Sequence, residues 1–200
     1  SNNTAICYVD GKEFGRITGN NNLGNTTMFI GGTYTVGGEN FDGHVSNARL
    51  IVGKGIYAEN FKPSMRELEV TPETVLLACQ SKTDKLEERS GNTTLSATGS
   101  LHAASELTPG ILTPIVKSGG GSAITGSVEF TSTTDALVLS AGTDFAYGTG
   151  DFTIEAWIQP QGINGGETKA IFTQSQSGND YIIFKVDSDK AIKATFGSTT

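Results

Sequence analysis

The sequence predicts an all-β protein, built as an antiparallel jelly-roll sandwich, and three observations lead to this prediction. Helical periodicity is almost absent from the 200 residues. Segments in which apolar and polar residues alternate recur about every 10 to 15 residues, separated by glycine, asparagine, aspartate and serine. The composition agrees, because 26 glycines and a hydrophobic fraction of 36% suit many short strands joined by tight turns around a thin core.

The first half of the chain contains six candidate strands. Asp10-Gly11 separates the first two and favours a tight hairpin turn, because both residue types tolerate positive φ. Residues 73–80 form a nearly continuous apolar run, which is typical of a strand covered on both faces. The charged residues 82–89 are predicted to form a turn or a single helical turn. The six candidates are TAICYVD (4–10), GKEFGRI (11–17), TTMFIGG (26–32), GHVSNARLIV (43–52), ETVLLACQ (73–80) and TTLSATG (93–99).

The second half begins with a predicted linker, residues 101–125. This segment contains Pro109, Pro114 and the run Gly119-Gly120-Gly121-Ser122, which disfavour regular structure. Beyond it the alternation resumes. The candidate strands are SVEF (127–130), DALVL (135–139), DFTIEAWIQ (151–159), KAIFTQS (169–175), YIIFKV (181–186) and KAIKATF (190–196).

The longest strand of this half, residues 151–159, divides between two faces because successive side chains point in opposite directions. One face is apolar and is predicted to belong to the core: Phe152, Ile154, Ala156 and Ile158. The other face is mostly polar but carries the single tryptophan: Asp151, Thr153, Glu155 and Trp157. We therefore expect the second face to be concave and partly exposed.

Two long segments carry a family resemblance. Residues 126–160, GSVEFTSTTDALVLSAGTDFAYGTGDFTIEAWIQP, resemble the first half of a laminin-G-like, concanavalin-A-like jelly roll, whose pattern F-x-F/Y-G-x-G-D-F-T-I-E-x-W is matched from Phe145 to Trp157. The start of the chain resembles the second half of such a domain, in family order. The matching segments there are YVDGKEFG (8–15), MFIGG (28–32), FDGHVSNARLIVGKGIYAENFKPS (41–64) and TVLLACQS (74–81).

The resemblance implies a particular domain organisation. Residues 1–100 correspond to the C-terminal part of one jelly roll, and residues 126–200 correspond to the N-terminal part of a second or circularly permuted one. The family places a further strand of the type W-x-H-V-A-x-x-R between the strands 190–196 and 4–10, and this sequence lacks it. The chain is then either a window of a longer repeat-bearing polypeptide or one permuted domain completed by a neighbour's strand. A half-sandwich alone would leave an open apolar face and unpaired edges.

Charge and composition exclude several classes of protein. A net charge of −7 argues against a nucleic-acid binder, which usually presents a basic face, and against binding to an anionic membrane. No run of 18 apolar residues is present, so no membrane insertion is predicted. Cys7 and Cys79 lie in apolar strands and are predicted to be buried free thiols, with a disulfide between them as the alternative.

Catalysis is not predicted. Glycoside hydrolases with related jelly rolls place two or three carboxylates along one strand face, and Asp151 and Glu155 share such a face. However, Thr153 stands between them and no third carboxylate follows, so we expect a turn-capping aspartate and a solvent-facing glutamate. His44 and His102 lack a nearby ligand or base partner in sequence and are predicted to be surface histidines.

Calcium is the one cofactor that the sequence leaves open, because some laminin-G-like domains bind it in loops at the rim of the sandwich. Calcium prefers several oxygen ligands with carboxylates close together. The candidate ligands are Asp180, Asp187 and Asp189, and plain turn formation is the competing interpretation of these residues.

Ligand binding is a second open hypothesis. The polar loop GNNNLGN (19–25) suits hydrogen bonding to sugar hydroxyls, and aromatic side chains can stack on sugar rings. For Arg49 the favoured interpretation is a buried arginine paired with a carboxylate, with Asn47 on the same side of its strand. The candidate ligand-binding residues are Asn20, Asn21, Asn22, Tyr34, Asn47, Arg49 and Trp157.

The functional expectation comes from the resemblance. Residues 47–63, NARLIVGKGIYAENFKP, and 76–81, LLACQS, resemble variants with N-x-R-I-V-x-G-x-x-Y-x-x-N-F-x-P followed by LL-x-C-Q-S, although this chain reads L-I-V-G where the pattern has I-V-x-G. Such variants are typical of tandem domains in large virion proteins of marine phages. This implies a non-enzymatic adhesive or structural module of a tail fibre or capsid decoration, at the virion surface or otherwise extracellular. Its partners would be other virion subunits, copies of itself or cell-surface polysaccharide. The alternative is a carbohydrate-binding module or glycoside hydrolase-related domain of a secreted bacterial protein.

Overall fold

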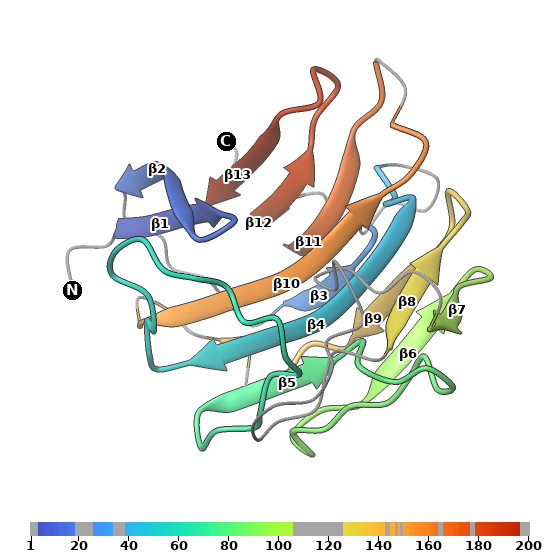
Figure 1. Ribbon diagram of the computed structural model, residues 1–200, viewed down its shortest axis with the longest axis horizontal. Coiled ribbons are helices and arrows are strands. Elements are labelled where there is room, and N and C mark those ends of the chain that lie inside the picture. Colours follow the sequence, from blue (N-terminus) through green and yellow to red (C-terminus); the bar gives the residue numbers. More distant parts are fainter. Residues whose placement is uncertain are drawn as a thin grey trace.

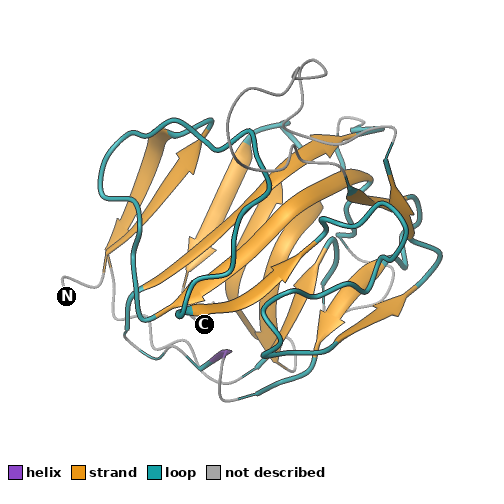
Figure 2. Ribbon diagram, turned by 60° about the horizontal axis from the view of Figure 1, so that its bottom comes forward, coloured by secondary structure: helices purple, strands orange, loops and turns teal. Residues whose placement is uncertain are grey.

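The computed structural model describes residues 4–18, 26–33, 39–105, 126–142, 145–146, 148, 150–163, 166–176 and 179–196. Within these ranges the chain forms thirteen strands and no α-helix, with only a 3-10 turn at Phe145 (Figure 2). Every pairing between two of these strands is antiparallel. The prediction of an antiparallel all-β protein is confirmed, whereas the finer assignment to a jelly roll stays a prediction.

Two large sheets and one hairpin contain all of these strands (Figure 1). The six-stranded sheet has the order β13 (Ile192–Phe196), β12 (Asn179–Val186), β11 (Lys169–Gln176), β3 (Thr27–Ile30), β9 (Ala136–Leu139) and β6 (Leu95–Thr98). The five-stranded sheet has the order β10 (Phe152–Pro160), β4 (Gly43–Val52), β8 (Ser127–Phe130) and β7 (His102–Ala104), with β5 (Thr74–Ala78) also paired to β4. The hairpin consists of β1 (Thr4–Val9) and β2 (Lys12–Thr18).

The strands lie where the alternation predicts them. β4 has the predicted bounds, and the Asp10-Gly11 turn joins β1 to β2 with φ values of 50° and 71°. Residues 82–89 form turns without a helix, and Glu88 makes an isolated bridge to Ala78. β7 is the unexpected strand, because it lies within the predicted linker 101–125. The remainder of that linker, residues 106–125, lies outside the described residues.

Strands from the two ends of the sequence pair with each other in both large sheets. β10 pairs along β4 from Phe152↔Val52 to Pro160↔Gly43. β3 is held between β11 and β9, so a strand of the first segment lies between two strands of the second. Residues before 105 and after 126 therefore build the same two sheets. The assignment of these segments to one permuted domain or to successive repeats stays a prediction.

Apolar side chains of the two large sheets form one buried cluster. Val45 and Leu50 of β4 are completely buried, as are Ile30 of β3 and Leu137 of β9. Burying one such aliphatic side chain contributes about 1.5–3 kcal/mol to folding. The apolar face predicted for residues 152–158 packs against this cluster, as expected, but its side chains are only partly buried.

Two further expectations can be compared with the structure. Cys7 and Cys79 are both buried free thiols, as predicted, and burial raises the pKa of Cys7 to about 11 and that of Cys79 to about 12. Among the described residues there is no helix long and apolar enough to cross a membrane.

Candidate functional site

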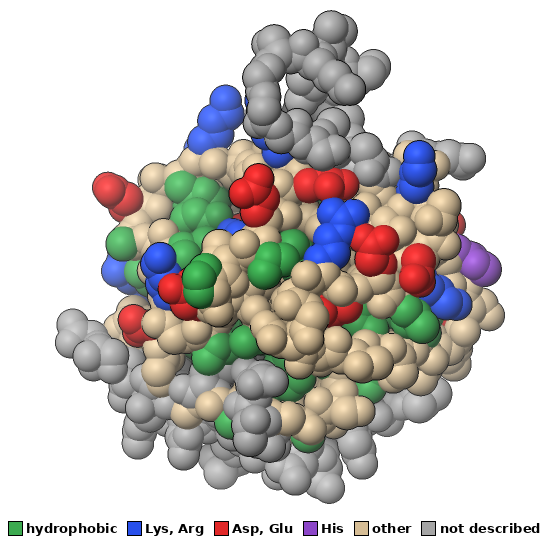
Figure 3. Space-filling view, turned by 90° about the horizontal axis from the view of Figure 1, so that it is seen from below, with side chains coloured by type: hydrophobic (Ala, Val, Ile, Leu, Met, Phe, Trp, Pro, Cys, Tyr) green, Lys and Arg blue, Asp and Glu red, His purple; other side chains and the backbone are tan. Residues whose placement is uncertain are grey.

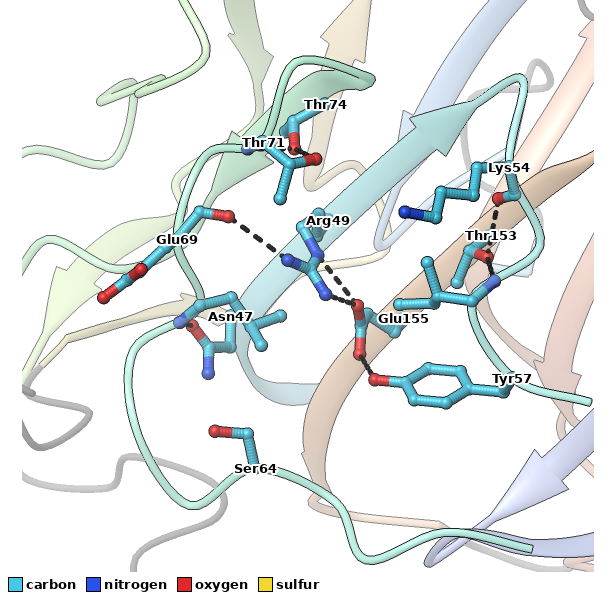
Figure 4. A network of polar contacts seen from close by, with 12 residues as sticks. Asn47, Arg49, Lys54, Tyr57, Ser64, Glu69, Thr71, Thr74, Thr153 and Glu155 are labelled. Carbon is cyan, nitrogen blue, oxygen red and sulfur yellow. Dashed lines mark hydrogen bonds and ion pairs between the residues drawn. The ribbon is translucent and has the colours of Figure 1, made fainter. Parts of the chain in front are cut away.

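A polar network joins β4 and β10 across 106 positions of sequence (Figure 4). Arg49 lies opposite Glu155 in the strand register and donates from Nε and Nη2 to Glu155 Oε1, at 2.8 and 2.5 Å. The Tyr57 hydroxyl donates to Glu155 Oε2 at 2.8 Å, and Arg49 Nη1 donates to the carbonyl of Glu69 at 3.2 Å. The buried arginine–carboxylate pair favoured by the sequence is present.

The expectation that Glu155 faces solvent is wrong. Its side chain is 19% exposed, and both of its oxygens accept hydrogen bonds from Arg49 or Tyr57. Burial, and secondarily the negative charge of Glu155, hold the pKa of Tyr57 well above its usual value, so this hydroxyl remains a donor. Asp151, the other candidate acid, is exposed. The network holds the Glu155 carboxylate in place by charge-assisted hydrogen bonds, which are stronger than hydrogen bonds between neutral groups.

Residues 53–69, here called the covering loop, are fastened over the five-stranded sheet by Asn47. Asn47 has a φ of 56°, a left-handed conformation that asparagine tolerates better than most residues. Its Nδ2 donates to the carbonyl of Arg66 at 2.8 Å, and its Oδ1 accepts from the amide of Leu68 at 3.0 Å and from Gln80 Nε2 at 2.6 Å. Asn47 is therefore an anchor for the covering loop.

The same loop covers the polar face of β10. The Thr153 hydroxyl accepts from the amide of Ile56 and donates to the carbonyl of Lys54, each at 3.1 Å. The indole Nε1 of Trp157 donates to the carbonyl of Ser64 at 2.8 Å. The face that we expected to be partly exposed is half-buried at Thr153, Glu155 and Trp157 and exposed at Asp151, and the covering loop is bonded to it along much of its length.

The covering loop also reaches the β1–β2 hairpin. The amide of Phe61 donates to the carbonyl of Gly11 at 2.9 Å, and the amide of Glu13 donates to Asn60 Oδ1 at 2.8 Å. The rings of Tyr57 and Phe61 stack with centroids 3.5 Å apart. The covering loop thus spans from β10 to a hairpin that pairs with neither large sheet (Figure 1).

Beneath this span lies a cavity of about 450 Å³, here called the edge groove. β1 and β10 form its two sides, the covering loop forms its roof, and the end of the six-stranded sheet forms its floor. Its apolar surface includes Ile6, Phe61, Ile154, Ile182, Phe184 and Phe196.

The structure brings together only part of the predicted ligand-binding set. Asn47, Arg49 and Trp157 lie on the same side of the five-stranded sheet, and each is bonded to the covering loop. Asn47 and Trp157 also line the edge groove. The remaining members of the set lie outside the described residues: Asn20, Asn21, Asn22 and Tyr34.

Two of the calcium candidates are bonded to a lysine. Lys193 Nζ donates to Asp187 and lies 3.2 Å from Asp189 Oδ2, and the Thr168 hydroxyl donates to Asp187 Oδ1 at 2.9 Å. The hydrogen bond from Lys193 is the main cause that lowers the pKa of Asp187. The side chain of Asp180 is outside the described part of the structure. No cluster of three or more potential ligands occurs among the side chains that are described, and calcium binding stays a prediction.

The prediction of a surface histidine is wrong for His44. This residue of β4 is 2% exposed, with Nδ1 3.3 Å from Ser127 Oγ and Nε2 3.6 Å from Glu129 Oε1. Burial lowers the pKa of His44, and the nearby carboxylate of Glu129 opposes this effect. His102 is exposed and lies opposite Glu129 in the β7–β8 register.

Sequence reasoning missed the contribution of Tyr57 and Phe61 as the roof of a groove. A signal for the network was available, because an arginine that is buried in a strand is expected to have a carboxylate partner. Identifying that partner required the β4–β10 pairing. The edge groove itself had no direct signal in the sequence.

Comparison of the chain with protein-family models, curated proteins and solved structures finds no match in any of the three. The laminin-G-like resemblance therefore depends on the motifs themselves.

Charged side chains of both signs are mixed on the face shown in Figure 3. Lys and Arg side chains lie there among Asp and Glu side chains and do not form a basic patch of their own.

Proposed function

We propose that the protein is a non-enzymatic structural and adhesive module of a phage virion appendage, a tail fibre or a capsid decoration, with a laminin-G-like, concanavalin-A-like jelly-roll fold. Its principal role is to contact neighbouring virion proteins or copies of itself, and host-surface glycans are a second partner class. The sandwich-like pair of sheets and the motifs between Phe145 and Trp157 support the fold assignment.

The edge groove is the observation that carries this proposal. It exposes apolar side chains next to strands that end their sheets, whereas natural proteins normally cover or charge such edges. An apolar opening at a strand edge is best closed by polypeptide, because its side chains can bury the apolar lining while its backbone hydrogen-bonds to the strand edge. A groove of this kind is suited to contact with another polypeptide, which is what the proposed role in subunit contact requires.

The hydrolase alternative has less support. A glycosidase needs one carboxyl group able to donate a proton and a second one placed across the scissile bond. Both oxygens of Glu155 already accept hydrogen bonds from Arg49 and Tyr57, and Trp157 uses its indole N–H on the covering loop. These contacts favour a structural role for this part of β10.

The proposal is tested by sedimentation velocity, dye binding and a glycan array on the purified protein. We expect concentration-dependent self-association together with binding of an apolar fluorescent dye at the open groove. Glycan binding in addition would assign the adhesive role. A monodisperse monomer that melts cooperatively, binds no dye and retains no glycan would contradict the proposal. Polysaccharide cleavage that is lost in Glu155→Gln would support the hydrolase instead.

A further inference from the structure

β4, β8 and β7 lie side by side in the five-stranded sheet (Figure 1), and their register places both histidines of the chain beside one carboxylate. His44 of β4 and His102 of β7 are each paired with Glu129 of the middle strand, β8. Directly opposite residues of neighbouring strands project from the same face of a sheet. Val45 and Val128, which follow His44 and precede Glu129 in sequence, belong to the buried apolar cluster. The row of three therefore lies on the face turned away from the core.

The hydrogen bonds of Ser127 determine which nitrogen of the His44 ring carries the proton. Ser127 Oγ donates to the carbonyl of Ala104 at 3.4 Å, so the same oxygen is left to accept from His44 Nδ1, which lies 3.3 Å away. Assigned from this network, Nδ1 carries the proton and Nε2 carries a lone pair. Burial, which lowers the pKa of His44, favours this neutral ring.

Two electron-rich atoms face each other on the other side of this ring. His44 Nε2 is buried and has no hydrogen-bond partner among the described residues, and it lies 3.6 Å from Glu129 Oε1. That distance is longer than the roughly 2.7–3.2 Å of an N–H···O hydrogen bond. A buried lone pair opposite a carboxylate oxygen requires a positive charge between them, either a proton or a metal ion.

The geometry suits a metal ion better than a proton. A zinc ion binds imidazole nitrogen and carboxylate oxygen at about 2.0–2.2 Å, so two such ligands at the tetrahedral angle lie about 3.4 Å apart. The observed 3.6 Å between His44 Nε2 and Glu129 Oε1 is close to this value. Histidines that bind a metal also usually donate their other N–H to an oxygen, as His44 does to Ser127.

His102 is the third candidate ligand. No group of three ligands is already gathered among the side chains that the structure describes. However, His102 is exposed, so its ring can turn toward Glu129 about its side-chain bonds. The side chain of Glu129 is 33% exposed, which gives an ion access from solvent. Two histidines and one glutamate, with a fourth position open to water, form a ligand set that zinc accepts.

We propose that His44, Glu129 and His102 bind one divalent transition-metal ion of the zinc type on the face of the five-stranded sheet that is turned away from the core. His44 Nε2 and Glu129 Oε1 are ligands in their present positions, and His102 completes the site when its ring turns inward. Imidazole nitrogen favours zinc, nickel or copper over calcium and magnesium, which prefer oxygen ligands. None of the three residues lines the edge groove, so the site is independent of the proposed role in subunit contact.

The test titrates Zn²⁺ into the whole, untagged protein after a chelator has removed bound metals. We expect one Zn²⁺ per protein by calorimetry and at least about tenfold weaker binding of Ca²⁺ and Mg²⁺. His44 and His102 are the only histidines, so imidazole NMR signals report each ring separately, and both sets should shift with Zn²⁺. Co²⁺ as a probe should give an absorption spectrum without a sulfur charge-transfer band, which excludes binding at Cys7 or Cys79.

Two variants locate the site. Glu129→Gln and His102→Ala should each weaken Zn²⁺ binding at least about tenfold. The matched control is Glu59→Gln, which changes an exposed carboxylate of the covering loop and should leave binding unchanged. Because His102 is also exposed, His102→Ala keeps the test valid if a change at Glu129 disturbs folding.

Three outcomes would overturn the metal site. The first is wild-type Zn²⁺ affinity in Glu129→Gln or in His102→Ala, and the second is a sulfur charge-transfer band with Co²⁺. The third is a His44 signal that responds to pH but not to Zn²⁺, because a proton alone would then fill the gap to Glu129. Each of these outcomes leaves the proposed role in subunit contact unaffected.

Discussion

β4 and β10 run side by side, yet they occupy opposite situations. β4 pairs with β10 along one edge and with β8 and β5 along the other, and nine of its ten residues are buried. β10 pairs only with β4 among the described strands, and its first seven residues are partly buried. Both strands alternate apolar and polar residues. The difference shows that burial depends on the neighbours that a strand acquires, and that the β10 side is where the fold is open.

The largest expected effect is loss of packing on the closed side. Leu50→Ala in β4 removes a completely buried side chain and should lower the free energy of unfolding by about 2–5 kcal/mol. Ile154→Ala in β10 is the matched change on the open side, and it should cost less than about 2 kcal/mol because Ile154 is only partly buried. Urea unfolding of both variants measures this difference. Equal losses would mean that β10 is closed in solution.

The next prediction concerns the network between the two strands. Arg49→Met leaves the carboxylate of Glu155 without its cation and should cost about 3 kcal/mol, since removing one partner of a largely buried pair strands the other charge. The double variant Arg49→Met with Glu155→Gln should recover part of that loss. A double-mutant cycle by urea unfolding checks the coupling. A double variant that is as unstable as the sum of the single variants would indicate that the pair contributes nothing.

A smaller effect is expected at the contact between hairpin and covering loop. Gly11 has a φ of 71°, and a Cβ there would lie 1.9 Å from the carbonyl oxygen of Phe61. Gly11→Ala should therefore cost about 1–3 kcal/mol and loosen the roof of the edge groove. Gly15→Ala in β2 is the control, because nothing lies within 4 Å of its added Cβ. Thermal unfolding compares the two, and an equal effect would contradict the close approach of loop and hairpin.

The smallest effect is a pH dependence on the closed side. Burial lowers the folded-state pKa of His44 below its usual value of 6.5. As the pH is lowered, His44 therefore becomes protonated at a higher pH in the unfolded chain than in the folded protein. The stability that neutral His44 contributes is complete above pH 6.5. It is lost as the pH falls from 6.5 to the folded-state pKa, by at most about 1.4 kcal/mol per pH unit. Unfolding in urea at pH 7.5 and 5.5 should show a smaller pH dependence for His44→Gln than for the wild type. The control is His102→Gln, and an unchanged pH dependence in His44→Gln would contradict the burial of this ring.

Local features could be read from the sequence with good agreement. Alternation located β4 with its observed bounds, and Asp10-Gly11 located the hairpin turn, because both signals depend on residues next to each other. The inward face of β10 was also predictable from its period of two. Arg49 could be assigned a carboxylate partner in general terms. Glu155 could not be identified as that partner, because the two residues are 106 positions apart.

The sequence by itself determined the all-β class, the positions of most strands and the burial of the cysteines, since these follow from local periodicity and side-chain polarity. Only the tertiary structure decided which strands pair, that His44 is buried and that Glu155 is covered by Tyr57 of the covering loop. It also decided that an apolar groove opens between β1 and β10. The physical reason is that pairing and covering join residues far apart in the chain, and a local pattern contains no information about which distant partner satisfies an edge.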